Sequence, residues 1–248
     1  MRNVRVFIPI ELSAGARVVL PEQAAQHIIK VLRLRLGAAL TLFNGQGGEY
    51  GAKLIEIHRK IVSVEVGTFS PVERESTLHI TLLQGLARGE RMDFIIQKAT
   101  ELGVARIIPV QTERSVVQLD DTRVEKRSEH WRNVAAAACE QCGRNILPNI
   151  NAPLNLFFAC KATLMAQQRW LLSPEATQSL IETATAQATE LSSIAILIGP
   201  EGGLSDAEEI IAQSSGFRPM QFGARIMRTE TAAIAALAAL QSLAGDLG

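Results

Sequence analysis

The 248-residue sequence has few aromatic residues, few cysteines and no long hydrophobic run. One tyrosine, two tryptophans and eight phenylalanines provide little material for an extended platform on which single-stranded bases stack. No apolar segment is long enough to span a membrane, and the apolar part of the N-terminal MRNVRVFIPIE is too short for a signal peptide. We therefore expect the protein to stay in the cytoplasm.

Three cysteines in a chain without an export signal predict thiols rather than disulfides. Cys139 and Cys142 form a C-x-x-C pair, but this pair ends an Ala-rich helical run, AAAACEQCGR, whereas a redox motif begins a helix after a strand. No second pair completes a zinc tetrahedron. The histidines share no metal-ligand spacing: His27, His58, His79 and His130. We therefore predict no metal site.

The formal net charge is zero, which argues against a basic tail or a basic field over the whole surface. The charge is nevertheless uneven along the chain. Residues 1–72 contain nine Lys/Arg and five Asp/Glu, whereas residues 73–248 contain sixteen and twenty. Any polyanion should therefore meet the N-terminal part.

The hydrophobic pattern changes near residue 73. Before it, short strands rich in β-branched residues predict a small barrel, interrupted by one helix in PEQAAQHIIKVLRL. The polar stretch VEREST, which follows Pro71, is the best candidate for a linker. After it, strands such as LHITLLQ, RIIPV and SIAILIG alternate with helices, which predicts an α/β domain with a mainly parallel sheet. We predict two domains, residues 1–72 and 73–248.

Ligands of α/β sheets bind beyond the carboxyl ends of the strands, where this sequence has LLSPE, IGPEGG and FGARIMRTETA. None of these loops is a dinucleotide fingerprint or a P-loop. Ser205 to Glu208 read as a capping box, so Gly199 to Leu204 form a true connection. Its glycines have two interpretations, a tight turn that needs positive φ or a backbone that lies against a ligand.

The charged residues of these loops also have two interpretations. Glu201 could stabilise a helix N-terminus, or it could accept a proton or orient a base. Arg225 and Arg228 could form surface ion pairs with Glu230, or they could bind phosphate. No Ser-His-Asp or nucleophile-elbow pattern is present, so covalent catalysis is not expected.

The pair of loops LIGPEGGLSDAE and FGARIMRTETAA resembles the cofactor-binding motifs of the SPOUT methyltransferases. Four further segments, HIIKVLRL, RGERMDFIIQKATELGV, ERSVVQL and AACEQCGRNILP, resemble the ribosomal RNA small subunit methyltransferase E family and occur in its order. The resemblance covers nearly the whole chain. It implies a C-terminal SPOUT α/β domain with a deep trefoil knot, preceded by a small PUA-like β-barrel that binds RNA. It also implies a homodimer whose site lies near the subunit interface.

The resemblance implies S-adenosylmethionine as the cofactor. Stiff proline-glycine backbone suits adenine, which presents hydrogen-bond donors and acceptors but no charge. The implied cofactor-binding residues are Leu172, Gly199, Pro200, Gly202, Gly203, Ile226, Met227 and Thr229. The Ala-rich final helix, residues 229–244, could form part of the dimer interface, and burial in the monomer core explains it equally well.

The implied reaction is methylation at N3 of a uridine in 16S ribosomal RNA. This nitrogen lies on the pairing edge, so the base must be unpaired or flipped, and its proton must leave as the methyl group arrives. We predict that Arg228 stabilises the developing charge on a uracil oxygen, with Glu201 or a water as proton acceptor; positioning alone is the alternative. The predicted RNA-binding residues, each of which could instead be an ordinary solvated charge, are Arg2, Arg5, Lys30, Arg33, Arg35 and Arg225.

Three rival functions stay open. Another SPOUT reaction, such as ribose 2′-O-methylation, would use the same knot motifs. An RNA-binding ribosome-assembly factor could keep the fold without turnover. An oxidoreductase is the most distant alternative, because the dinucleotide fingerprint is absent.

Overall fold

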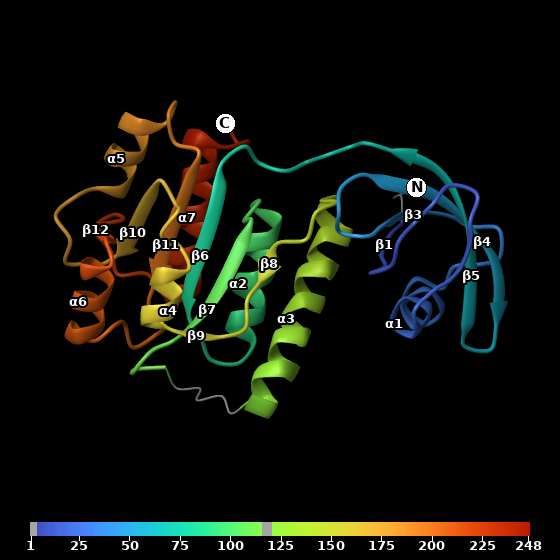
Figure 1. The fold of residues 1–248 in the computed structure, drawn as a ribbon, viewed down its shortest axis with the longest axis horizontal. Coiled ribbons are helices and arrows are strands. Elements are labelled where there is room, and N and C mark those ends of the chain that lie inside the picture. The colour runs from blue at the N-terminus through green and yellow to red at the C-terminus, as the bar shows by residue number, and fades with distance from the viewer. Residues whose placement is uncertain (1–3, 116–120) are drawn as a thin grey trace. The chain divides into compact units, whose positions relative to one another are not determined.

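The computed structural model describes residues 4–115 and 121–248. The chain forms two compact units, one of Met1–Glu75 with Ala136–Leu147 and one of Ser76–Ala135 with Pro148–Gly248 (Figure 1). The segment 72–76, which contains the end of the first unit and the first residue of the second, has no regular secondary structure. The assignment of separate functions to residues 1–72 and 73–248 stays a prediction.

The first unit contains a five-stranded sheet in the order β1-β3-β4-β5-β2, in which β1 and β3 are parallel and the other neighbours antiparallel. Its strands are β1 (Arg5–Phe7), β2 (Arg17–Val19), β3 (Ala39–Phe43), β4 (Glu49–His58) and β5 (Ile61–Ser70). The predicted single helix is divided into α1 (Glu22–Gln26) and a π-helix (His27–Leu32). Strand β2 was not predicted, because three residues are too few for a visible alternation.

Residues 136–147 complete the first unit through hydrogen bonds to residues far away in sequence. The backbone N–H of Phe7 donates to a carboxylate oxygen of Glu140 at 2.9 Å. The Asn145 amide donates to the carbonyl of Val72 at 2.6 Å, and Arg144 Nε donates to Glu75 at 3.0 Å. Arg144 is only 3% exposed, so its charge needs this carboxylate as a partner.

The second unit is built on a seven-stranded sheet in which every described strand pair is parallel, which confirms the α/β prediction. The order is β12-β10-β11-β6-β7-β8, and β9 pairs with β7. The strands are β6 (His79–Gly85), β7 (Arg106–Gln111), β8 (Asn149–Ile150), β9 (Leu154–Asn155), β10 (Gln168–Leu172), β11 (Ser193–Ile198) and β12 (Arg218–Met220).

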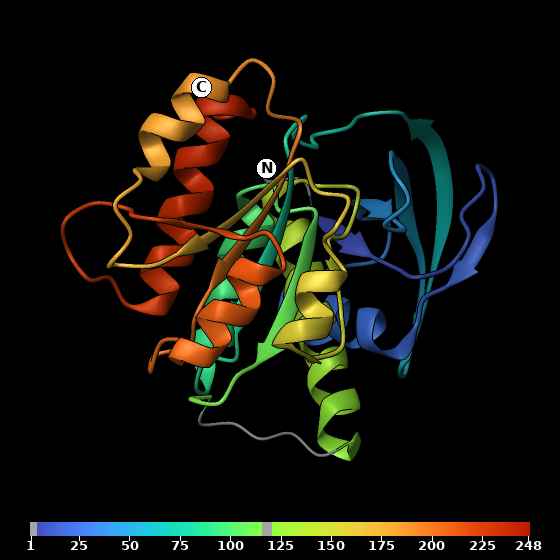
Figure 2. The same ribbon diagram turned by 60° about the vertical axis from the view of Figure 1, so that its left-hand side comes forward.

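Helices cover both faces of this sheet (Figures 1 and 2). One core cluster combines buried residues of α2, α3, α5 and α7, and the other combines those of α4 and α6. Alternate residues of β11 enter the two clusters, Ile194 and Ile196 the first and Ala195 and Leu197 the second. The helices are α2 (Glu90–Glu101), α3 (Asp121–Cys142), α4 (Leu156–Lys161), α5 (Leu180–Gln187), α6 (Asp206–Ser214) and α7 (Thr229–Ala244).

Two details of the helices bear on the sequence-based expectations. Cys139 and Cys142 lie on α3 without a disulfide, as predicted. Helix α7 buries Ala233, Ala236 and Leu237 in the larger core cluster, so monomer packing accounts for its apolar face. Neither in residues 4–115 nor in 121–248 is there a helix with the length and apolar character needed to cross a membrane.

Candidate active site

The predicted site loops leave the carboxyl ends of β10, β11 and β12, which are neighbours in the parallel sheet. Leu172 is the last residue of β10 and is partly buried. The Gly199–Gly203 loop follows β11, and residues 221–228 connect β12 to α7. The topology therefore brings the three predicted loops to one edge of the sheet.

The Gly199–Gly203 loop is a tight turn that packs closely against the end of β6. The N–H of Gly203 donates to the carbonyl of Pro200 at 2.9 Å, and Gly203 has a φ of +70°. A Cβ on Gly85, the last residue of β6, would lie 2.4 Å from the nitrogen of Pro200. Of the three glycines in the loop, Gly203 alone has a positive φ, so the interpretation as a tight turn applies there; Gly202 is exposed, and Gly199 and Gly203 are partly exposed, which leaves backbone available for a ligand.

Thr229, the first residue of α7, holds the loop through hydrogen bonds of its side chain. Its hydroxyl donates to the carbonyl of Gly199 at 2.7 Å and accepts from Nε2 of Gln84 at 2.9 Å. Gln84 is fully buried on β6 and also donates to the carbonyl of Gly85 at 3.0 Å. The Thr229 hydroxyl thus connects the end of β6 with the start of the Gly199–Gly203 loop, although these segments are more than 100 residues apart in sequence.

A second attachment comes from the segment after β7. Nη1 of Arg114 donates to the carbonyls of Gly202 and Leu204 at 3.2 and 3.0 Å. Ser205 and Glu208 form the predicted capping box at the start of α6, and Glu208 also accepts from the N–H of Glu113 at 2.8 Å. The end of the loop and the first turn of α6 are therefore held together.

The Glu201 carboxylate makes the third attachment. It accepts from the N–H of Arg88 at 3.0 Å and from Nη1 of Arg91 at 2.8 Å. Burial raises the pKa of this carboxyl, but the N–H groups of Arg88 and of Glu201 itself, together with the Arg91 guanidinium, lower it by more. The pKa of Glu201 therefore lies below its ordinary value, and the group is ionised at neutral pH.

The segment before α7 is open to solvent. Ile226 is 85% exposed, Arg225 and Arg228 are exposed, and Met227 is partly buried. The sequence allowed an ion pair between these arginines and Glu230. Within the described part of the chain, Glu230 instead pairs with Arg91, whose Nε lies 3.9 Å from Oε1 of Glu230. The two arginines therefore present their charges to whatever approaches this edge.

The predicted RNA-binding residues differ in their surroundings. Arg5 is only 11% exposed, pairs with Glu49, donates to the side chain of Asn145 at 2.6 Å and lies over the ring of Phe43. Its charge is thus satisfied inside the first unit. Lys30, Arg33 and Arg35 are exposed in and after the π-helix, and Arg2 lies outside the described residues. RNA contact by any of these residues stays a prediction.

Sequence reasoning missed three residues that position the loops, namely Gln84, Arg91 and Arg114. A signal for Gln84 exists, because a polar residue ends the apolar strand LHITLLQ. Arg91 and Arg114 lie in two of the segments that carry the family resemblance, but the resemblance did not indicate their contacts, since each contacts a residue about 90 to 110 positions away.

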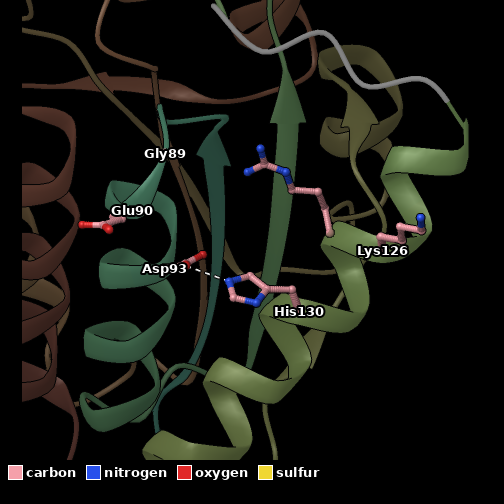
Figure 3. A pocket seen from close by; sticks show the side chains of 6 residues that line it. Gly89, Glu90, Asp93, Lys126 and His130 are labelled. Carbon is pink, nitrogen blue, oxygen red and sulfur yellow. Dashed lines mark hydrogen bonds and ion pairs between the residues drawn. The ribbon is translucent and has the colours of Figure 1, made fainter.

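A hollow of about 360 Å³ lies between the start of α2 and α3, and none of the predicted cofactor residues lines it. Figure 3 shows Asp93 and His130 pointing toward one another across it, and Nε2 of His130 lies 2.7 Å from Oδ2 of Asp93. Glu90 points to the other side of α2 in this view. None of the residues of the Gly199–Gly203 loop lines the hollow.

Comparisons with known proteins agree in both parts of the chain. A family model described as an RNA methyltransferase domain matches residues 74–241, and one described as an RNA methyltransferase PUA domain matches residues 20–67. The ribosomal RNA small subunit methyltransferase E of Buchnera aphidicola from Acyrthosiphon pisum is 34% identical over 98% of this chain and 94% of its own length. The Bacillus subtilis protein of the same name is 33% identical over 88% and 87%.

Two solved structures cover the whole of both chains. A methyltransferase from Legionella pneumophila, in complex with its cofactor S-adenosylmethionine, has a TM-score of 0.94 and 38% identity. The ribosomal RNA small subunit methyltransferase E of Neisseria gonorrhoeae, bound to S-adenosylmethionine, has a TM-score of 0.88 and 36% identity. Over nearly its whole length this chain therefore belongs to the ribosomal RNA small subunit methyltransferase E family.

Proposed function

We propose that this protein transfers the methyl group of S-adenosylmethionine to N3 of a uridine in 16S ribosomal RNA of the small ribosomal subunit. The observation that carries the proposal is the Gly199–Gly203 loop, held by three separate attachments at the carboxyl edge of the sheet. The cofactor of the Legionella and Neisseria proteins supports the same ligand here, since both structures superpose on this chain over its full length.

The residues at this edge fit the cofactor. Among the described residues, and apart from the chain neighbours of Gly203, no atom lies within 4 Å of the position that a Cβ on Gly203 would occupy, so the backbone there is approachable. Ile226 offers an apolar side chain that is 85% exposed and gains from being covered. The residues that would hold the cofactor are Leu172, Gly199, Pro200, Gly202, Gly203, Ile226, Met227 and Thr229. When bound, S-adenosylmethionine supplies an electrophilic methyl group on its sulfonium.

Arg228 is the residue to which we assign stabilisation of the uracil oxygen. It is exposed and is the N-cap residue of α7, immediately before the anchored Thr229, so its backbone position is fixed. A fixed guanidinium stabilises negative charge that develops on a nearby oxygen as N3 loses its proton. For the proton we favour water over Glu201, because the lowered pKa of Glu201 and its two hydrogen bonds make that carboxylate a weak base.

Further parts of the proposal concern topology and assembly. A deep trefoil knot is supported by the family resemblance and is compatible with the return of α7 from the edge strand β12 to α2, β6 and β11 in the middle of the sheet. A homodimer with the site near its interface is supported by the family resemblance and by the exposed Ile226. Closure of the first sheet into an RNA-binding barrel is supported by the match to the PUA domain. A ribosomal substrate implies a cytoplasmic reaction.

The direct test is methyl transfer from labelled S-adenosylmethionine to small ribosomal subunits from cells that lack this protein, followed by nucleoside analysis. Label in 3-methyluridine is the expected result. Label in a 2′-O-methylated nucleoside would move the protein to another SPOUT reaction. No label, despite measurable binding of cofactor and subunit, would favour an assembly factor without turnover.

The role of Arg228 has its own test. Replacement of Arg228 by Ala should lower kcat by about 100-fold, the usual effect of losing one charge-stabilising donor, with a much smaller change in cofactor affinity. Kinetics with saturating subunits and calorimetry of cofactor binding measure the two effects separately. An equal loss of kcat and cofactor affinity would instead place Arg228 in the cofactor site.

A further inference from the structure

We propose that Arg91 is a positioning residue of the active site, whose guanidinium holds the cofactor loop through Glu201 and the start of α7 through Glu230. The inference rests on the proposed function, because it takes the Gly199–Gly203 loop to be where the cofactor binds. Arg91 itself has no role in the chemistry under this proposal.

The contacts of Arg91 join the two segments that flank the predicted site. Its Nη1 donates to Oε1 of Glu201 at 2.8 Å, and its Nε lies 3.9 Å from Oε1 of Glu230. Arg91 lies in the first turn of α2, a helix whose Met92, Ile95 and Ile96 are fully buried. A side chain that starts from so firmly packed a helix can serve as a fixed point for the Gly199–Gly203 loop and for the start of α7.

Burial of the Glu230 carboxylate makes its contact with Arg91 important. Its side chain is 15% exposed, and its Oε2 is buried without a hydrogen-bond partner among the described atoms. A largely buried carboxylate needs a neighbouring positive charge, and Arg91 is the ion-pair partner that the described residues provide. Because Glu230 is two residues after Arg228, the position of Arg91 also bears on the predicted catalytic arginine.

Arg91 differs from the other attachments of the loop. Thr229 and Arg114 bind backbone carbonyls of Gly199, Gly202 and Leu204, whereas Arg91 binds the one charged side chain that the loop has. A loop with three glycines among five residues loses much conformational freedom when it orders around a ligand. An attachment that orders it beforehand lowers this cost and therefore raises cofactor affinity.

The experiment compares Arg91→Ala, Arg91→Lys and Glu201→Gln with wild type by calorimetry of S-adenosylmethionine binding and by methyl-transfer kinetics. Lys98→Ala is the matched control, because it removes another cation of α2 that is paired with a glutamate, at 2.9 Å from Glu101. Arg91→Ala should weaken cofactor binding about fivefold, the size expected for one partly exposed ion pair. Lys98→Ala should leave it unchanged.

Two further readouts separate positioning from general stability. Arg91→Lys, which keeps the charge but not the planar fork, should restore part of the affinity. In a Glu201→Gln background, Arg91→Ala should have a smaller effect than in wild type, because the shared contact is already weakened. At saturating cofactor, kcat of Arg91→Ala should fall less than kcat/KM for the cofactor.

The proposal is overturned if Arg91→Ala binds the cofactor as wild type does, or if Lys98→Ala loses as much affinity. It is also overturned if the effects of Arg91→Ala and Glu201→Gln simply add. Should Arg91→Ala fail to fold, Glu201→Gln carries the test, since it removes the same contact from the loop side. Wild-type protein that binds no cofactor would instead refute the proposed function.

Discussion

Removal of the Thr229 hydroxyl is the sharpest test of how the site is held together. Thr229→Val keeps the shape of the side chain but removes the bond to the Gly199 carbonyl and the bond from Gln84. Each lost bond costs about 1 kcal/mol net, and an acceptor left unpaired adds at least about 1 kcal/mol. Gln84 keeps its bond to Gly85, which limits the loss. We expect the free energy of unfolding to fall by about 2–3 kcal/mol.

Thermal unfolding followed by circular dichroism measures this effect. For a domain of this size, each kcal/mol lowers Tm by about 2–4 °C, so Thr229→Val should lower it by about 4–12 °C. The control is Thr229→Ser, which keeps the hydroxyl and removes one methyl group, at a cost of about 1 kcal/mol. The reasoning is refuted if Val is tolerated as well as Ser, because the hydroxyl would then stabilise nothing.

Two further predictions address the same loop. Gly85→Ala brings a Cβ to within 2.4 Å of the Pro200 nitrogen, so cofactor affinity measured by calorimetry should fall about tenfold. Gly51→Ala should have no effect, because apart from its chain neighbours no atom of the described residues lies within 4 Å of the added Cβ. The pKa of Glu201 in the folded protein lies below its ordinary value of 4.5. The ionised carboxylate therefore stabilises the folded state at pH values above 4.5, and this stabilisation is lost as the pH falls through the lowered pKa. The difference in Tm between wild type and Glu201→Gln should therefore be constant above about pH 5 and shrink below it; a difference that grows on acidification would contradict the assignment.

Much of the fold could be predicted because the second unit is locally consistent. The pattern of Met92, Ile95, Ile96 and Ala99 predicts α2, and all four residues are fully buried. The first unit shows the limit of such reasoning. Local sequence does not indicate that a helix will widen into a π-helix at His27–Leu32, or that residues 136–147 will pack with strands from the start of the chain.

The candidate site could be predicted in part, for a related reason. The Gly-Pro-Glu-Gly-Gly spacing identifies a tight connection after a buried strand, and the structure confirms that geometry. Charge alone does not reveal burial, so Arg5 could not be distinguished from an exposed arginine until Glu49 and Asn145 were placed beside it. Arg91 and Arg114 were missed because their partners come from distant segments, which only the topology brings together.

Because residues 136–147 belong to the first unit, this unit can finish folding on the ribosome only after they have been synthesised. A nascent chain that ends at residue 75 lacks Glu140, Arg144 and Asn145, and so lacks the partners of Phe7, Glu75 and Val72. At synthesis rates of about 5–20 residues per second, residues 136–147 are synthesised several seconds after residue 75, and the first unit stays incomplete during that time. Folding of the two units is therefore interleaved in time, and a release of the N-terminal segment by one cleavage near residue 75 yields an incomplete body rather than a free module.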